Sequence, residues 1–129
     1  MILRKYMSIL GIGSAQIDLI LPKEEFQAGE CINGYFLIKG GVIEQKLKRI
    51  DCDLVLADLT TDEERIIETT NILTSKQIES EEQNRIDFTF RLPSDLMATT
   101  DVRTYHFNTR LVFDEGVISK DLDIIRIMD

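Results

Sequence analysis

Apolar and polar residues alternate with a period of two along most of this chain, which is the pattern of half-buried β-strands. No stretch keeps apolar residues at i, i+3, i+4 and i+7 for more than a few turns, so long amphipathic helices are not expected. Five segments alternate clearly and are rich in β-branched and aromatic residues: 16–21, 31–39, 49–59, 85–92 and 104–113. The pattern predicts an all-β protein.

Two weaker segments complete the expected strands. Residues 65–78 are rich in β-branched residues, but their phase is ambiguous at Ile66 and Ile67. Residues 117–128 shift phase around Leu122 to Ile125, which predicts a β-bulge there. Turn-forming residues separate the segments. About seven short strands predict an immunoglobulin-like antiparallel β-sandwich, and 129 residues predict one domain over 1–129.

Side-chain parity along these strands predicts the core. The inward residues are Ile17, Leu19, Leu21, Ile32, Phe36, Ile38, Ile50, Cys52, Leu54, Leu56, Ile86, Phe88, Phe90, Leu92, Tyr105, Phe107, Leu111 and Phe113. Parity puts Cys31 on the opposite face of its strand from the core, whereas Cys52 points inward. Two thiols so placed predict reduced cysteines in a cytosolic protein and no disulfide.

The net charge of −8 argues against nucleic acid as a partner, because phosphate binding needs clustered Lys and Arg, and it equally disfavours anionic membranes. Residues 60–64 and 79–84 are acidic and are expected to form an acidic loop surface. At the N-terminus, Arg4 and Lys5 precede an apolar run from residue 6 to 13 that is far too short to span a bilayer. We expect residues 1–13 to be retained, with one short helix. Secretion with processing near Ala15 is the alternative.

Candidates for chemistry are few and scattered. His106 is the only histidine, and parity places it on the solvent face, with no nucleophile motif nearby. Asp51 and Asp53, like Asp121 and Asp123, put two carboxylates about 7 Å apart on one strand face, a spacing that could contribute to a calcium site. We interpret both pairs as solvated outer-face charges. No catalytic, cofactor-binding or metal-binding residue is assigned, and no cofactor is expected.

Two glycine clusters are candidates for phosphate-binding loops. Residues 11–13 read Gly-Ile-Gly but precede a strand, which excludes a dinucleotide-binding fingerprint. Gly40 and Gly41 lack the Lys-Ser/Thr of a P-loop, and alternation is poor immediately after them, which disfavours a two-residue hairpin. We interpret them as flexible backbone at a corner, with residues 42–47 passing to the other sheet.

Residues 11–55 resemble the start of the bacterial sporulation-control SpoOM family. The matching positions are Gly11 to Gly13, Gly29-Glu30, Gly34, Lys39 to Gly41 and Glu44-Gln45. Residues 90–99 and 104–127 resemble later strands of the family. The family is similar to arrestins, with an N-terminal β-sandwich joined to a second one. The resemblance implies an arrestin-like N-terminal domain or a half-length relative.

The resemblance also implies a function. We expect a non-enzymatic cytoplasmic module that regulates sporulation, or a related process, by binding other proteins. Open sandwich edges can accept a partner strand, from another protein or from a second copy in a homodimer. No nucleic-acid binding and no membrane insertion are expected. The alternative is a secreted calcium- or carbohydrate-binding sandwich with the D-x-D pairs as ligands.

Overall fold

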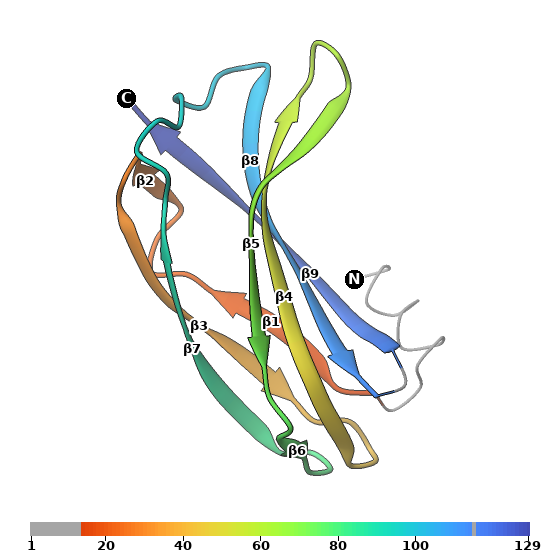
Figure 1. Ribbon diagram of the computed structural model, residues 1–129. Coiled ribbons are helices and arrows are strands. Elements are labelled where there is room, and N and C mark those ends of the chain that lie inside the picture. Colours follow the sequence, from red (N-terminus) through yellow and green to blue (C-terminus); the bar gives the residue numbers. More distant parts are fainter. Residues whose placement is uncertain (1–13, 115) are drawn as a thin grey trace.

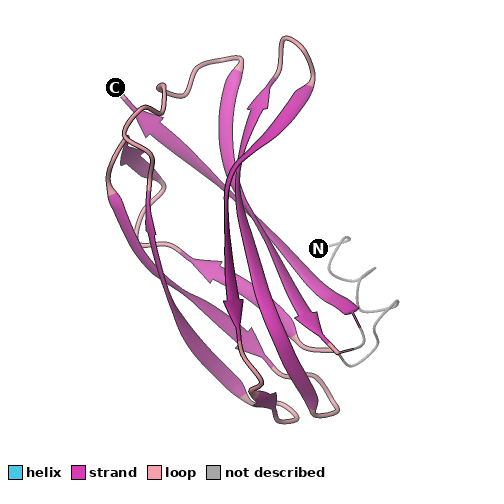
Figure 2. Cartoon of the chain, in the orientation of Figure 1, coloured by secondary structure: helices cyan, strands magenta, loops and turns pink. Residues whose placement is uncertain are grey.

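The described part of the chain, residues 14–129 without residue 115, forms nine β-strands in the computed structural model (Figure 1). They are β1 (Gln16–Ile20), β2 (Glu25–Gln27), β3 (Cys31–Lys39), β4 (Gln45–Asp58), β5 (Glu63–Leu73), β6 (Gln77–Ile78), β7 (Gln83–Arg91), β8 (Arg103–Phe113) and β9 (Gly116–Met128). Figure 2 shows strands and loops alone, with no helix in this part of the chain. The predicted all-β class is confirmed, whereas the short helix expected within residues 1–13 lies outside the described residues.

The strands form two sheets that pack face to face. The smaller sheet has the order β1-β3-β7 and is antiparallel throughout. The larger has the order β2-β9-β8-β4-β5, and β6 pairs with the beginning of β4. Among the described residues, no helix is long and apolar enough to cross a membrane.

Two short strands were not predicted. β2 lies within a stretch expected to be a turn, and it pairs with β9 in parallel, with Phe26 opposite Ile127. β6 belongs to the weak segment 65–78 but is separated from β5 by three residues. The strand count is therefore higher than expected, and one pairing in the sandwich is parallel.

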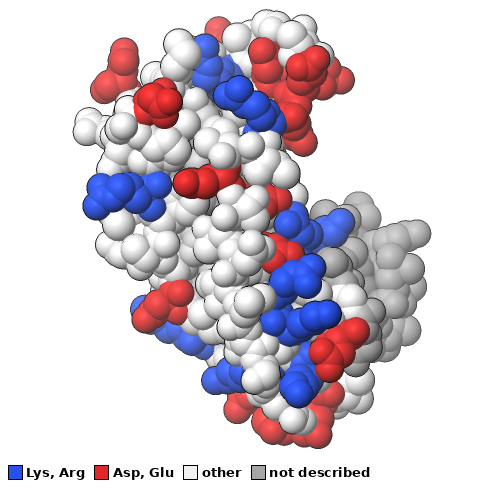
Figure 3. All heavy atoms as spheres, in the orientation of Figure 1, with Lys and Arg blue, Asp and Glu red and all other residues white. Residues whose placement is uncertain are grey.

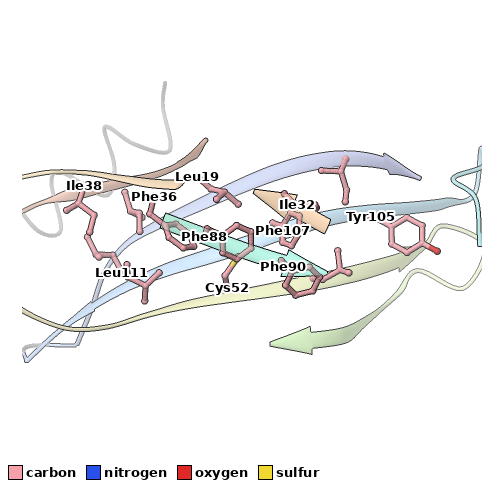
Figure 4. Close-up of a cluster of buried hydrophobic side chains, with 14 of the residues drawn as sticks. Leu19, Ile32, Phe36, Ile38, Cys52, Phe88, Phe90, Tyr105, Phe107 and Leu111 are labelled. Atoms are coloured by element: carbon pink, nitrogen blue, oxygen red, sulfur yellow. The ribbon is translucent and has the colours of Figure 1, made fainter. Parts of the chain in front are cut away.

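The core contains the residues that parity predicted. Phe36, Phe88, Phe90 and Phe107 form its aromatic centre, with ring centroids 5.1 to 6.0 Å apart (Figure 4). Edge-to-face pairs such as Phe90 with Phe107 contribute about 0.5–1.5 kcal/mol each beyond their burial. Three predicted core residues, Leu21, Leu56 and Ile86, are only partly buried and pack against the rim of this core.

A bulge in β5 resolves the ambiguous phase of that strand. The register skips one residue of β5 opposite the step from Leu54 to Val55. As a result, Ile67 packs against the core while Ile66 lies on the outer face, 58% exposed. The bulge expected around Leu122 in β9 was wrong, because that strand pairs in continuous register from residue 119 to 125. The irregularity lies nearer the start of β9, opposite the step from Leu111 to Val112.

The Gly-Gly stretch does lie at a crossing between sheets. β3, in the smaller sheet, ends at Lys39, and β4, in the larger sheet, begins at Gln45. β4 starts earlier than expected, because Gln45 and Leu47 are already inward-facing strand residues and Lys48 interrupts the register with β8. That irregularity explains the poor alternation seen in the sequence.

Gly40 is required by a close approach of backbone. A Cβ at this position would collide with the backbone carbonyl oxygen of Glu79. The backbone N–H of Gly40 donates to the carbonyl of Glu82 (2.7 Å), and the N–H of Glu81 donates to the carbonyl of Gly41 (2.9 Å). This stretch is hydrogen-bonded to the loop before β7, so the expectation of free, flexible backbone is replaced by a tightly packed corner.

Candidate functional site

The outer edge of β1 is closed by side chains. Alternate backbone N–H groups of an edge strand face away from the neighbouring strand and would attract another chain. Here three such groups donate to side chains: Ala15 N to Gln45 Oε1 (3.0 Å), Ile17 N to Ser119 Oγ (3.2 Å) and Leu19 N to Asp121 Oδ2 (2.8 Å). Ser119 and Asp121 belong to β9, so these bonds join the two sheets along one side. This edge is not available to a partner strand.

β5 forms an open edge. It is the last strand of the larger sheet and is exposed over most of its 11 residues. The backbone N–H of Thr74 donates to the carbonyl of Lys48 (3.2 Å), which sets the phase of the ladder between β5 and β4. By the alternation of antiparallel pairing, the backbone N–H and C=O groups of Asn71 and Leu73 point away from β4, toward the open side of the sheet. The Leu73 side chain is 79% exposed. This edge offers backbone donors and acceptors together with apolar side chains.

The Asp51 and Asp53 carboxylates attach β5 to the sheet. They were interpreted as solvated charges, and this was wrong: Asp51 is 5% exposed and Asp53 is 3% exposed. The Asp51 carboxylate accepts a hydrogen bond from Asn71 Nδ2 (2.7 Å), and the Asp53 carboxylate accepts one from Thr69 Oγ1 (2.8 Å). Both donors lie on β5, so side chains of the outer face reinforce the backbone ladder between β4 and the edge strand.

Two arginines neutralise these carboxylates. Arg110 of β8 donates from a terminal guanidinium nitrogen to Asp53 Oδ2 (2.9 Å), and its Nε lies 3.8 Å from Asp51 Oδ2. Arg49 Nε lies 3.1 Å from both oxygens of Asp51. The hydrogen bond to Asp53 raises the pKa of Arg110, since the carboxylate favours the charged guanidinium. We call Arg49, Asp51, Asp53 and Arg110 the outer-face ion cluster.

The turn between β4 and β5 is acidic, as predicted. Acidic side chains gather at this tip of the molecule in Figure 3. Asp62, Glu63 and Glu64 are exposed there. The hydroxyl and backbone N–H of Thr60 donate to the Asp58 carboxylate and hold the pKa of that group below its usual value. The β5 edge therefore begins beside negative charge.

The second acidic loop, residues 79–84, packs against the Gly-Gly corner. Hydrogen bonding and charge repulsion from Glu44 raise the pKa of Glu79. Glu82 instead accepts a hydrogen bond from Asn84 Nδ2 (2.9 Å), which lowers its pKa. The two acidic loops lie at opposite ends of β5 in Figure 1 and do not form one surface.

The other D-x-D pair meets a third carboxylate. Oxygens of Asp121, Asp123 and Asp18, all half-buried, lie within 4.8 Å of one another. Asp18 belongs to β1, about a hundred residues earlier, and no local motif connects it with the pair. Three convergent carboxylates could hold a cation such as Ca²⁺, whose ligands are oxygens. Asp121 also accepts the hydrogen bond from Leu19, so it has a structural role.

The remaining candidates lie apart from the β5 edge. His106 is half-buried on the outer face of β8, opposite the buried Tyr105 and Phe107, as parity predicted. Cys52 is inside the core, and burial raises the pKa of its thiol to about 12. Cys31 is half-buried on the other face of its strand, and both cysteines are free thiols.

The sequence matches the family described as SpoOM protein over residues 3–129. The chain belongs to the SpoOM family. This confirms the resemblance found in the sequence, and it covers the first strands and the C-terminal strands alike. Among the positions that carried the resemblance, Gly34 has a structural role, because a Cβ there would collide with the backbone carbonyl of Ile20.

Individual relatives agree with the family. The chain is 31% identical over 128 residues to the sporulation-control protein spo0M of Bacillus subtilis, covering 95% of this chain and 50% of the relative. The crystal structure of Spo0M from Bacillus subtilis superposes with a TM-score of 0.80 over 92% of this chain and 51% of that one. This chain therefore spans about half the length of these relatives. A Niemann-Pick type C2 protein from the Japanese carpenter ant has a TM-score of 0.61 at 9% identity, covering 89% of this chain and 93% of that one. That likeness concerns the fold alone, and the arrestin-like β-sandwich is the fold of the family.

Proposed function

We propose that this chain is a non-enzymatic, cytoplasmic interaction module that regulates sporulation or a related process by binding a partner protein along the β5 edge. The observation that carries the proposal is the contrast between the β1 edge of the smaller sheet and the β5 edge of the larger sheet. Side chains close the edge of β1, whereas β5 exposes outward-facing backbone groups. The relationship to a sporulation-control protein supports a regulatory role.

Strand addition at this edge needs a firmly held template. The outer-face ion cluster supplies it, because Asp51 and Asp53 bind β5 through Asn71 and Thr69. An incoming strand would gain backbone hydrogen bonds from β5, and exposed side chains such as Leu73 would select its sequence. Because carboxylates lie at the start of β5, a partner strand with basic residues at its matching end fits best.

A photo-crosslinking residue at Glu68, exposed on β5, tests the location in cells of the source organism. We expect a discrete adduct with one partner from this position and none from the control position Thr89, which is exposed on the outer face of the smaller sheet. An adduct with the mass of two chains would identify a homodimer through edge strands as the occupant. Equal adducts from both positions would contradict the β5 location.

Leu73→Pro tests the mechanism. Proline removes the outward-facing N–H and leaves the ladder to β4 intact, so folding should persist. We expect adduct formation to fall about tenfold, since a lost hydrogen bond costs about 1 kcal/mol and the ring also blocks the approaching strand. Leu73→Ala is the matched control, because it keeps the N–H. If the Leu73→Pro variant captures the partner, and cells that carry it sporulate as the wild type does, strand addition at this edge is excluded.

A further inference from the structure

The outer face of the larger sheet carries a row of three aliphatic residues and one histidine across four strands, which we call the apolar row. The register places Ile66, Val55, His106 and Ile124 side by side on β5, β4, β8 and β9. Ile66 is 58% exposed and Ile124 is 68% exposed, and Leu122, the next outward residue of β9, is 57% exposed. β5 and β9, the strands at the two ends of this row, thus present large aliphatic side chains to solvent, on either side of the buried Val55.

Opposite charges lie beside this row on its two outer strands. Glu64 precedes Ile66 by two residues on β5, and Arg126 follows Ile124 by two residues on β9, so each shares the outer face with its isoleucine. Both charged residues are exposed. β5 is antiparallel to β4, β4 to β8 and β8 to β9, so β5 and β9 run in opposite directions. Glu64, which precedes its isoleucine, and Arg126, which follows its own, therefore lie on the same side of the apolar row.

This arrangement is self-complementary under a two-fold rotation. The axis lies between the two facing sheets, parallel to the strands and level with the gap between β4 and β8. Rotation about it places β5 of one copy over β9 of the other. Ile66 then lies over Ile124 of the second copy, and Glu64 lies over Arg126 of the second copy. Symmetry repeats each contact, so the apolar pair and the ion pair each form twice.

We propose that two copies of this chain associate face to face through the outer surfaces of their larger sheets, about this axis. A second copy fits better than an unrelated protein because both the apolar row and the charge pattern match themselves under the rotation. Charge complementarity also counters the general repulsion between two chains that each carry a net charge of −8. The lateral edge of β5 stays open, so the dimer does not depend on the proposed strand addition.

The size of the face sets the strength of this association. Four strands at a spacing of about 4.8 Å and about ten residues long offer on the order of 500 Å² per copy. Stable complexes commonly bury about 800 Å² on each partner. The expected dimer is therefore weak and reversible, and it should be measured at several protein concentrations.

Sedimentation equilibrium of the purified chain tests the apolar contact. We expect a reversible monomer–dimer equilibrium for the wild type and a dissociation constant at least tenfold higher for Ile124→Glu. Ile43→Glu is the matched control, because Ile43 is 59% exposed in the loop between β3 and β4, away from this face. A wild type that stays monomeric at every concentration overturns the proposal. An Ile43→Glu variant whose dissociation constant rises as much as that of Ile124→Glu also overturns it.

A charge swap tests the geometry. Glu64→Arg and Arg126→Glu should each weaken the dimer, and the double variant should recover wild-type affinity, because the two charges meet across the axis. Thermal melts check that each variant is folded. Failure of the double variant to recover rules out the stated axis. Leu73 also lies on the outer face, so Leu73→Pro is compared with Leu73→Ala, and the two variants should give the same equilibrium. A loss of dimer in Leu73→Pro alone would place the contact at the backbone of the β5 edge instead.

Discussion

Arg110→Met tests how much the outer-face ion cluster contributes to the stability of the protein. The substitution keeps an aliphatic side chain of similar length but removes the guanidinium that donates to Asp53 and faces Asp51. The side chains of the two aspartates are only 4% and 7% exposed, so both carboxylates would lose a cation in a poorly solvated position. The variant should be destabilised because a buried charge is left uncompensated, and the loss of the attraction itself is the smaller effect.

The magnitude follows from the burial of each partner. Removing one member of a fully buried pair costs about 3–5 kcal/mol. The Arg110 side chain is 27% exposed, so water can partly replace it, and Arg49 still faces Asp51. We therefore expect a loss of about 2–3 kcal/mol, close to the value of one charge-assisted hydrogen bond. For a chain of this length the melting temperature should fall by about 10 °C.

Urea unfolding, followed by circular dichroism, measures this loss. Arg85→Met is the control, because Arg85 and Asp87 form an ion pair with side chains that are 64% and 84% exposed. That variant should lose less than about 1 kcal/mol. Adding Asp53→Asn to Arg110→Met should recover part of the stability, since the amide oxygen can still accept the Thr69 hydroxyl without carrying a charge. If Arg110→Met costs no more than Arg85→Met, the cluster does not hold β5 as described.

Three further outcomes are expected. Gly40→Ala should destabilise the protein by about 2 kcal/mol or more in the same unfolding assay. The new Cβ would meet the backbone carbonyl of Glu79, which cannot move aside as a flexible side chain would. An unchanged urea midpoint would contradict the close approach. Glu79→Gln should raise the melting temperature at neutral pH but not at acidic pH. The hydrogen bond with Glu44 and the charge repulsion from it raise the folded-state pKa of Glu79, so stability is lost as the pH rises through that pKa, and the amide avoids this loss. Cys31 should react with a thiol reagent in the native protein at pH 8, whereas Cys52, buried and with a pKa of about 12, should react only after unfolding. Equal labelling of both cysteines in the native protein would contradict the burial of Cys52.

The core and the class of fold could be read from the sequence because the signal is local. A half-buried strand needs apolar residues at every second position, so parity alone placed Phe36, Phe88 and Phe107 inside. The same rule placed His106 outward and Cys52 inward. It failed where backbone irregularity shifts the phase, which is why the position of Ile66 stayed ambiguous and the bulge in β9 was expected in the wrong place.

The two D-x-D pairs show what local pattern could not decide. They look alike in sequence, but Asp51 and Asp53 lie on a central strand, where neighbours 16, 20 and 57 residues away cover and bind them. Asp121 lies beside β1 and binds the backbone of Leu19, 102 residues earlier. Carboxylates on a strand surface are solvated or buried according to what the adjacent strands carry, and only the tertiary pairing brings those strands together.

The sequence by itself determined that this chain is an all-β sandwich of the SpoOM family, with its apolar faces turned inward. The tertiary structure decided that the β1 edge is closed, that the β5 edge is open, and that position 40 requires a glycine. The reason is physical: hydrophobic periodicity is a property of each strand alone. Edge closure, ion-pair burial and close backbone approach depend instead on groups that meet only after the strands have paired.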